Sequence, residues 1–181
     1  DLPGRSTKSF ATSADDIGSL PLEVCETING SWGFNLKDRK HKSKKELVQY
    51  LIKAAGYDSN LLLNVGPMPN GKIQEEHIKS LKEIGDWIKV NGETIYGTIR
   101  GPIDPTDEIA STQKDNTIYI HLLDNRKTYF IEGYNPKIKK ISYYHSNKKV
   151  KYQKTKSGLI INVDDNELDE IINEQNKNYF I

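Results

Sequence analysis

The sequence predicts a chain of two parts, an α/β part followed by an all-β part. Up to about residue 90, β-prone apolar segments alternate with segments of helical periodicity, which is the order of an α/β layer structure. After Thr98 the chain turns to short β-prone segments separated by turn-forming or charged residues, which is typical of an antiparallel sandwich. Pro102 and Pro105 mark a linker-like stretch there. We therefore divide the chain into residues 1–97 and 98–181.

The first strand and helix follow from local signals. Residues 1–20 are rich in Ser, Gly, Asp and Thr and predict a connecting loop. The segment LEVCETI, which begins at Leu22, is short and β-prone. Ser43 and Glu46 form a capping-box signature, and the helical spacing that follows ends at Gly56.

A second strand and helix come next. The nearly continuous apolar run from Asn60 to Val65 suits a strand of a parallel sheet buried on both faces. A helix is expected from about Gln74 to Val90. Two βα units cannot close a barrel and would expose hydrophobic edges, so we expect this part to need more chain. The expected buried stripe of the helix consists of Ile78, Leu81, Gly85 and Ile88, with Ile84 and Trp87 beside them.

The second part is expected to consist mainly of short strands. The stretch 169–181 is compatible with a helix or with a closing strand that ends at Tyr179–Ile181, and we favour the strand. The other expected strands are residues 117–122, 128–131, 138–144, 150–152 and 159–163.

Composition limits the classes of partner. The chain of 181 residues has 26 Lys+Arg and 25 Asp+Glu, a formal charge of +1, which gives no general attraction to nucleic acid or anionic lipid. Its longest apolar run is too short to span a bilayer. The single Cys25 excludes an internal disulfide or a Cys-based zinc site, and the four histidines lack ligand spacing. We expect no nucleic-acid partner, no membrane partner and no metal site.

The segment Pro21–Asn35 holds the densest group of polar and aromatic residues, including Glu23 and Glu26. A retaining glycosidase needs two carboxyl groups about 5 to 5.5 Å apart, and an inverting one needs about 6.5 to 9.5 Å. Residues three apart in a strand point to opposite faces, with α-carbons roughly 10 Å apart. At most one of these two is therefore catalytic. The alternative is that both carboxylates are solvated or capping, with Trp32 and Phe34 in the core.

Three motifs give a specific resemblance. They are LEVCETINGSWGFN from Leu22, NLLLNVGPMPNGKI from Asn60 and LKEIGDWIKVNGETIYGT from Leu81. Their order and spacing resemble the α-L-fucosidases of glycoside hydrolase family 29. The resemblance implies that residues 1–97 are the C-terminal portion of a (β/α)8 catalytic barrel and that residues 98–181 are a C-terminal β-sandwich. A complete barrel needs roughly 250 residues, so the barrel here would be incomplete.

The resemblance also implies roles for single residues. Family members typically carry Trp-Glu where this chain has Leu22-Glu23, so the general acid/base role falls on Glu23, with Glu26 as the second candidate. Trp32 resembles an aromatic near the sugar site, and a structural role for it is equally open. The nucleophile of the family is an aspartate on an earlier strand, and Asp15 and Asp16 lie in an unlike context.

The implied function is that of a retaining exo-α-L-fucosidase, of which this chain supplies the acid/base and the N-terminal remainder of the barrel supplies the nucleophile. The substrate would be a fucosylated glycan, no cofactor is required, and the chain alone would be inactive. The resemblance favours a secreted, periplasmic or lysosome-like compartment, although the single cysteine leaves the compartment open.

Two other functions fit parts of the second half. A non-catalytic carbohydrate-binding or interaction module would use its tyrosines to stack on sugars, but alternating tyrosines also pack a sandwich. The lysine-rich stretch 137–156 could form a basic patch for nucleic acid or an acidic polysaccharide, but neighbouring acidic residues favour a solvated face. The tyrosines are Tyr119, Tyr129, Tyr134, Tyr143, Tyr144 and Tyr152.

Overall fold

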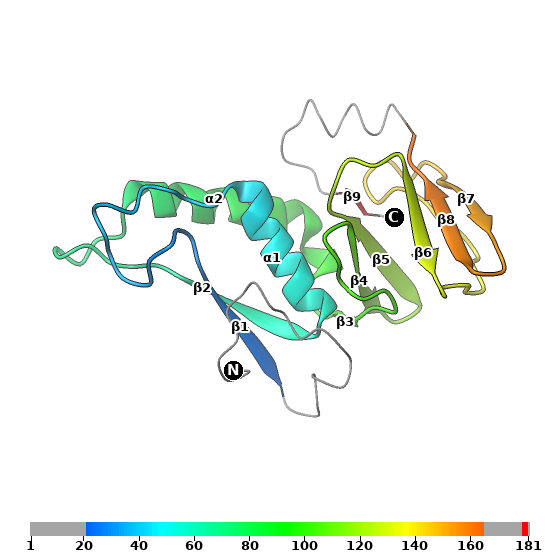
Figure 1. Ribbon diagram of the computed structural model, residues 1–181, viewed down its shortest axis with the longest axis horizontal. Helices are drawn as coiled ribbons and strands as arrows, with labels where there is room; N and C mark the ends of the chain where they lie inside the picture. Colours follow the sequence, from blue (N-terminus) through cyan, green and yellow to red (C-terminus); the bar gives the residue numbers. More distant parts are fainter. Residues whose placement is uncertain (1–20, 165–178, 181) are drawn as a thin grey trace. The chain divides into compact units, whose positions relative to one another are not determined.

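The structure is a computed structural model that describes residues 21–164 and 179–180 (Figure 1). It divides into two compact units, Asp1–Gly97 and Thr98–Ile181. The loop expected over residues 1–20, with Asp15 and Asp16, lies outside the described residues.

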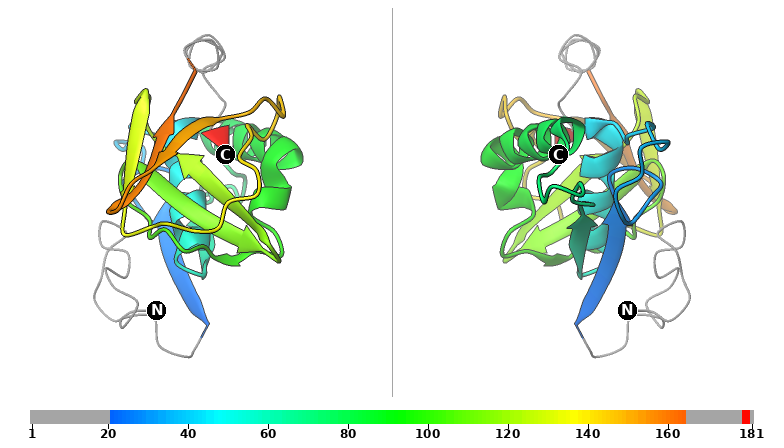
Figure 2. Two further views of the ribbon diagram at one scale, coloured as in Figure 1. Left: turned by 90° about the vertical axis from the view of Figure 1, so that its right-hand side faces the viewer. Right: turned by 90° about the vertical axis from the view of Figure 1, so that its left-hand side faces the viewer.

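The first unit has the predicted order of strand, helix, strand and helix. Its strands pair in parallel, in register from Leu22 opposite Ser59 to Thr27 opposite Asn64. Both helices lie on the same side of this two-stranded sheet (Figures 1 and 2). The elements are β1 (Leu22–Thr27), α1 (Lys44–Gly56), β2 (Ser59–Asn64), α2 (Glu75–Asn91) and a 3-10 turn, η2 (Gly92–Thr94).

The start of α1 confirms the capping box. The Ser43 hydroxyl accepts a hydrogen bond from the Glu46 backbone N–H at 3.2 Å. The Glu46 carboxylate accepts one from the Ser43 N–H at 2.7 Å. Two backbone donors that would otherwise lack helical partners are therefore satisfied. These contacts fix the point at which the chain turns into α1.

Two expectations for the first unit are wrong. No residue of β2 is buried, and Leu62 is 43% exposed, because β1 is the only strand beside β2 and only one face carries helices in the described part of the chain. The expected buried stripe of α2 is correct for Ile84 and Trp87, which are buried, and wrong for Leu81, which is exposed. Polar residues occupy further buried positions of α2, so apolar spacing alone does not find the centre of the buried side. The buried residues are His77, Ser80, Ile84, Trp87 and Asn91.

The second unit consists of two antiparallel sheets that share one core. The core takes Ile109, Ile120 and Leu122 from one sheet and Tyr129 and Ile161, among others, from the second. One sheet has the strand order β3-β4-β5-β9 and the other β6-β8-β7. The strands are β3 (Ile99–Arg100), β4 (Ile109–Lys114), β5 (Thr117–Leu122), β6 (Thr128–Glu132), β7 (Lys151–Lys154), β8 (Gly158–Asn162) and β9 (Tyr179–Phe180).

Sequence patterns missed β4 because its sequence, IASTQK, looks polar. Ser111 and Thr112 are nevertheless fully buried. The Ser111 hydroxyl donates to the Ile103 carbonyl and accepts from the Ile103 N–H, each at 2.8 Å. The Thr112 hydroxyl lies 3.1 Å from Nε2 of His121 on β5. Since each buried hydroxyl has a partner, the strand tolerates them in the core.

The strand expected over residues 138–144 is also wrong. The segment is irregular apart from a single bridge between Ser142 and Lys149. Ile138 and Ile141 both pack against the core although they lie three residues apart, a spacing that a strand with alternating faces does not give. The expectation that the chain ends in a strand is confirmed at β9, which pairs with His121 and Leu122 of β5.

Candidate active site

The carboxyl ends of β1 and β2 meet at one edge of the sheet because the two strands are parallel. Residues 28–43 leave this edge toward α1, and residues 65–74 leave it toward α2. Open parallel sheets and α/β barrels bind their ligands at this edge. The candidate site therefore includes the ends of both strands and these two loops.

Glu23 lies on the face of the sheet opposite the helices. Its register partner on β2 is Asn60, and the next residue of β2 on the same face is Leu62, which is exposed. Leu63, one residue further, packs with the helices and therefore marks the other face. Glu23 itself is exposed, and the Cys25 thiol lies 3.9 Å from its Oε1. Its carboxylate is open to solvent in this chain.

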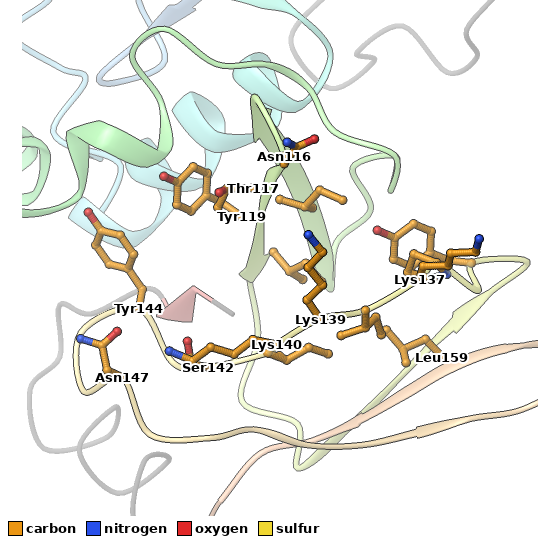
Figure 3. A pocket seen from close by; sticks show the side chains of 16 residues that line it. Asn116, Thr117, Tyr119, Lys137, Lys139, Lys140, Ser142, Tyr144, Asn147 and Leu159 are labelled. Atoms are coloured by element: carbon orange, nitrogen blue, oxygen red, sulfur yellow. The ribbon is translucent and has the colours of Figure 1, made fainter.

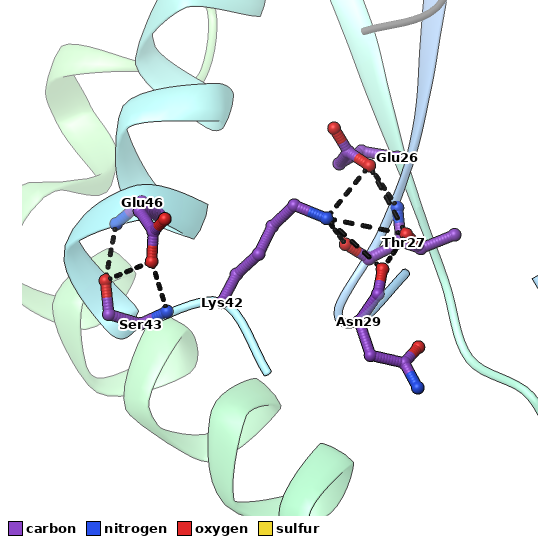
Figure 4. Close-up of polar contacts among 6 residues, drawn as sticks. All are labelled: Glu26, Thr27, Asn29, Lys42, Ser43 and Glu46. Atoms are coloured by element: carbon purple, nitrogen blue, oxygen red, sulfur yellow. Dashed lines mark hydrogen bonds and ion pairs between the residues drawn. The ribbon is translucent and has the colours of Figure 1, made fainter. Parts of the chain in front are cut away.

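Glu26 lies on the helix side of β1 and is buried (Figure 4). Its Oε1 forms an ion pair with Lys42 Nζ at 3.2 Å and accepts a hydrogen bond from the Thr27 N–H at 2.7 Å. Lys42 Nζ also donates to the Thr27 carbonyl at 2.7 Å and to the Asn29 carbonyl at 3.3 Å. Removing one member of a buried ion pair costs about 3 kcal/mol. Glu26 thus ties the end of β1 to the residue that precedes the α1 cap.

Tyr50 of α1 completes the surroundings of Glu26. Partial burial raises the pKa of the Tyr50 hydroxyl, and the negative charge and hydrogen bond of Glu26 raise it further. Lys42 Nζ lies 5.9 Å from the centre of the Tyr50 ring. The prediction that both carboxylates cannot act as one pair agrees with this geometry, because Glu23 and Glu26 face opposite sides of the sheet. The alternative of a solvated or capping Glu26 is wrong, since Glu26 is buried and paired.

Trp32 is presented to solvent at the carboxyl edge. Its side chain is 57% exposed, so the alternative that placed Trp32 in the core is wrong. Asn64 Nδ2, at the end of β2, donates to the Trp32 carbonyl at 2.6 Å. A Cβ on Gly66 would lie 2.5 Å from the carbonyl carbon of Gly33, so only glycine allows this approach. The end of β2 therefore holds the loop that carries Trp32.

A second set of contacts stiffens the same loop. The Ser31 hydroxyl donates to Asp38 Oδ2 at 2.8 Å, and Asn35 Nδ2 donates to Ser31 at 3.1 Å. The hydrogen bond from Ser31 lowers the pKa of the Asp38 carboxyl. The backbone around Trp32 is thus anchored on both sides while the indole remains exposed.

Comparison with known proteins identifies the relatives of this unit. The model of the α-L-fucosidase family matches residues 6–93. The match covers slightly less than half of the chain and shows what these residues are similar to. An α-L-fucosidase of Dictyostelium discoideum is 33% identical over 96 residues, which are 49% of this chain and 21% of that protein. The human plasma α-L-fucosidase is 38% identical over 79 residues, or 42% of this chain and 17% of the relative. The chain spans about a fifth of the length of these curated relatives.

Solved α-L-fucosidases share the fold. Isoenzyme 1 from Paenibacillus thiaminolyticus aligns with a TM-score of 0.69 at 31% identity and covers 80% of this chain and 36% of its own. The α-fucosidase of Thermotoga maritima in complex with fucose has a TM-score of 0.73 at 26% identity, with coverages of 82% and 37%. Each alignment covers a larger share of this chain than either unit alone provides, so the fucosidase likeness includes parts of both units.

A pair of histidines that sequence spacing did not indicate lies near the helix starts of the first unit, with His41 in the loop before α1 and His77 in the first turn of α2. The rings of His41 and His77 meet edge to face, with centres 5.5 Å apart. His41 Nε2 lies 2.9 Å from Gln74 Nε2. His77 is buried, and this burial, together with the nearby His41, lowers its pKa. The signal in the sequence was their position near the helix starts. His41 lies shortly before the start of α1, and His77 lies just after the start of α2.

These histidines do not make a metal site by themselves. In residues 21–164 and 179–180, no group of three or more His, Cys, Asp or Glu side chains is arranged to hold a metal ion. Within the same residues, no helix combines the length and apolar character that a bilayer crossing requires.

The tyrosines of the second unit are mostly packing residues. Tyr119, Tyr129 and Tyr143 are buried, and the other three of the predicted set are half-buried. The Tyr129 hydroxyl donates to Asp124 Oδ1 at 2.7 Å. Burial is the main cause that raises the pKa of this hydroxyl, and the hydrogen bond to Asp124 raises it further. Three of the six rings are therefore largely removed from solvent, which agrees with the alternative that these tyrosines pack the sandwich.

Proposed function

We propose that this chain is the C-terminal part of a retaining exo-α-L-fucosidase, which hydrolyses terminal α-L-fucose from glycans. In this proposal the first unit is the end of a (β/α)8 barrel, the second is a β-sandwich, and the N-terminal remainder supplies the aspartate nucleophile. The family match to residues 6–93 supports it. So does the coverage of about a third of the solved fucosidases, because the rest of their length would contain the missing strands.

The observation that carries the proposal is the separation of the two glutamates. In a (β/α)8 barrel the helices form the outer ring, so the sheet face away from them is the interior. Glu23 lies on that face, whereas Glu26 lies on the helix side in an ion pair with Lys42. A carboxylate that is buried on the helix side and paired with a lysine cannot exchange a proton with a substrate inside the barrel. We therefore assign the general acid/base to Glu23.

The position of Glu23 suits a pocket for one terminal sugar. Glu23 is the second residue of β1 and lies four residues before Thr27, about 13 Å below the carboxyl end of the strand. Trp32 is at that end, where its exposed ring can pack against the C–H face of a sugar. In the proposed pocket, Glu23 lies near the bottom and Trp32 at the rim.

The chemistry then has two steps. The Glu23 carboxyl donates its proton to the glycosidic oxygen while the C–O bond breaks and the nucleophile of the N-terminal part forms a bond to the anomeric carbon. The resulting Glu23 carboxylate next takes a proton from water, whose oxygen displaces the nucleophile. Fucose leaves with its configuration retained, and Glu23 is protonated again for the next cycle.

The test is made in the full-length enzyme with Glu23→Ala. Turnover of a glycan with a natural linkage should fall by about 100-fold or more, because a sugar leaving group needs the proton. An aryl fucoside with a good leaving group should lose less in its first step. Azide should restore the turnover of the aryl fucoside by Glu23→Ala, since azide attacks the glycosyl-enzyme intermediate without a general base.

Glu26→Gln is the matched control on the same strand. It should lower the free energy of unfolding by about 3 kcal/mol because Lys42 loses its buried partner. At a temperature where the variant is folded, azide should have no effect on it. If Glu23→Ala keeps wild-type turnover of the natural glycan, or if azide rescues Glu26→Gln instead, the assignment of Glu23 is wrong.

A further inference from the structure

The second unit contains a pocket of about 610 Å³ that the proposed fucosidase site does not use (Figure 3). One wall is β5 with the turn before it, from Asn116 to Ile120, and the other is the irregular segment 134–147. Its volume lies in the range of small-molecule sites, about 300 to 1,000 Å³.

The wall formed by the irregular segment is held in place. Ile138 and Ile141 pack into the core, and the Val150 N–H donates to the Ile141 carbonyl at 3.2 Å. At its start, Lys154 Nζ donates to the Pro136 carbonyl, and Asn135 Nδ2 donates to the Thr155 carbonyl at 3.2 Å. These contacts keep the segment apart from β5, so the pocket is formed before any ligand arrives.

The lining combines lysines with aromatic rings. Lys137, Lys139 and Lys140 line the pocket, and no Asp or Glu is among the described residues that do so. In Figure 3 the Lys139 side chain extends from the irregular segment toward β5. Tyr119 and Tyr144 meet edge to face, with ring centres 6.0 Å apart.

We infer that this pocket binds an anionic saccharide, one that carries a sulfate or a carboxylate group. Tyrosine rings pack against the C–H faces of sugars, and hydroxyl and amide groups such as those of Thr117, Ser142 and Asn147 bind sugar hydroxyls. Lysine ammonium groups with no acidic neighbour in the lining favour an anion. The small number of lysines and the limited volume of the pocket suit a short saccharide rather than a polyanion that needs an extended basic surface.

The test is titration calorimetry of the whole 181-residue chain with three ligands on one core: lactose, monosulfated lactose and sialyllactose. At low salt, at least one charged ligand should bind about tenfold more tightly than lactose. Tighter binding of monosulfated lactose alone, of sialyllactose alone or of both would show whether the pocket accepts a sulfate, a carboxylate or either group. Raising the salt to about 0.5 M should remove most of the difference. No activity is measured, so this result is independent of the Glu23 assignment.

Two variants and a matched control locate the binding. Lys139→Gln should weaken the charged ligand about fivefold and leave lactose unchanged, and Tyr144→Ala should weaken all three ligands. Lys156→Gln removes an exposed lysine outside the lining and should have no effect. Circular dichroism confirms that each variant is folded. Equal affinity for charged and neutral ligands, binding of inorganic sulfate alone, or equal effects of Lys139→Gln and Lys156→Gln would overturn the inference.

Discussion

The two units bury their strands to very different extents. Among the described residues of the second unit, eleven buried side chains from both sheets and the segments between their strands form one core, including the fully buried Ile161. In the described part of the first unit, buried apolar side chains such as Ile28, Leu47 and Ile84 lie between the sheet and the helices, and Leu62 on the free face of the sheet is exposed. Apolar side chains on strands are stable in water only when another layer covers them. The second unit therefore contains its core among the described residues, whereas the first presents an uncovered sheet face, which supports the proposed incomplete barrel.

Lowering the pH should affect the second unit most. Burial lowers the pKa of His121 on β5 from 6.5 to about 3. Between these values the unfolded chain binds a proton that the folded chain does not, so stability falls as the pH falls. The loss is about 4 kcal/mol from pH 6.5 to pH 3. Urea unfolding at several pH values, followed by far-UV circular dichroism, measures it.

The control for this prediction is His121→Gln, which keeps a polar side chain near Thr112 but has no group that titrates in this range. Its stability should depend less on pH than that of the parent chain. Both tryptophans, Trp32 and Trp87, lie in the first unit, so their fluorescence reports that unit separately. A pH dependence that is unchanged in His121→Gln would contradict the prediction.

Truncating one leucine in each unit compares the two strand environments directly. Leu159→Ala on β8 removes a side chain that is 1% exposed, and it should cost about 3 kcal/mol. Leu62→Ala on β2 removes one that is 43% exposed, and it should cost less than about 1 kcal/mol in this chain. Urea midpoints of the two variants give both values.

The same Leu62→Ala substitution in the full-length protein sharpens the comparison. If further strands cover the free face of β1 and β2, the cost should rise to about 2 kcal/mol or more. An equally small cost in both contexts would mean that no layer covers this face, and it would count against the barrel proposal.

The sequence predicted those features that depend on local signals. The capping box at Ser43, the order of elements up to α2 and the strand β5 follow from caps, turns and periodicity. The failures have tertiary causes. The buried hydroxyls of β4 become acceptable only through partners on other segments, Ile103 and His121. The segment 138–144 remains irregular because its two isoleucines reach the core at a spacing that does not fit a strand.

The candidate site was predictable to a similar degree. The alternation of side chains along a strand was enough to exclude Glu23 and Glu26 as one catalytic pair. The sequence could not show which of them faces the helices, because that depends on the position of Lys42, sixteen residues away from Glu26. The exposure of Trp32 required the contact with Asn64, which lies thirty-two residues along the chain. Such contacts between distant residues leave no periodic trace in the sequence.

The smallest expected effect concerns Asn64, which joins the edge of the sheet to the Trp32 loop. Asn64→Ala removes the 2.6 Å hydrogen bond to the Trp32 carbonyl and should cost about 1 kcal/mol. Amide hydrogen exchange of a peptide covering residues 30–38 should become faster. Asn60→Ala, on the same strand and the same face, is the matched control and should leave this exchange unchanged. In the full-length enzyme, Asn64→Ala should raise KM for the glycan more than it lowers kcat, because the loop would position the sugar without touching the reacting atoms. A fall in kcat with no change in KM or in exchange would show that Asn64 acts on the chemistry itself and not through Trp32.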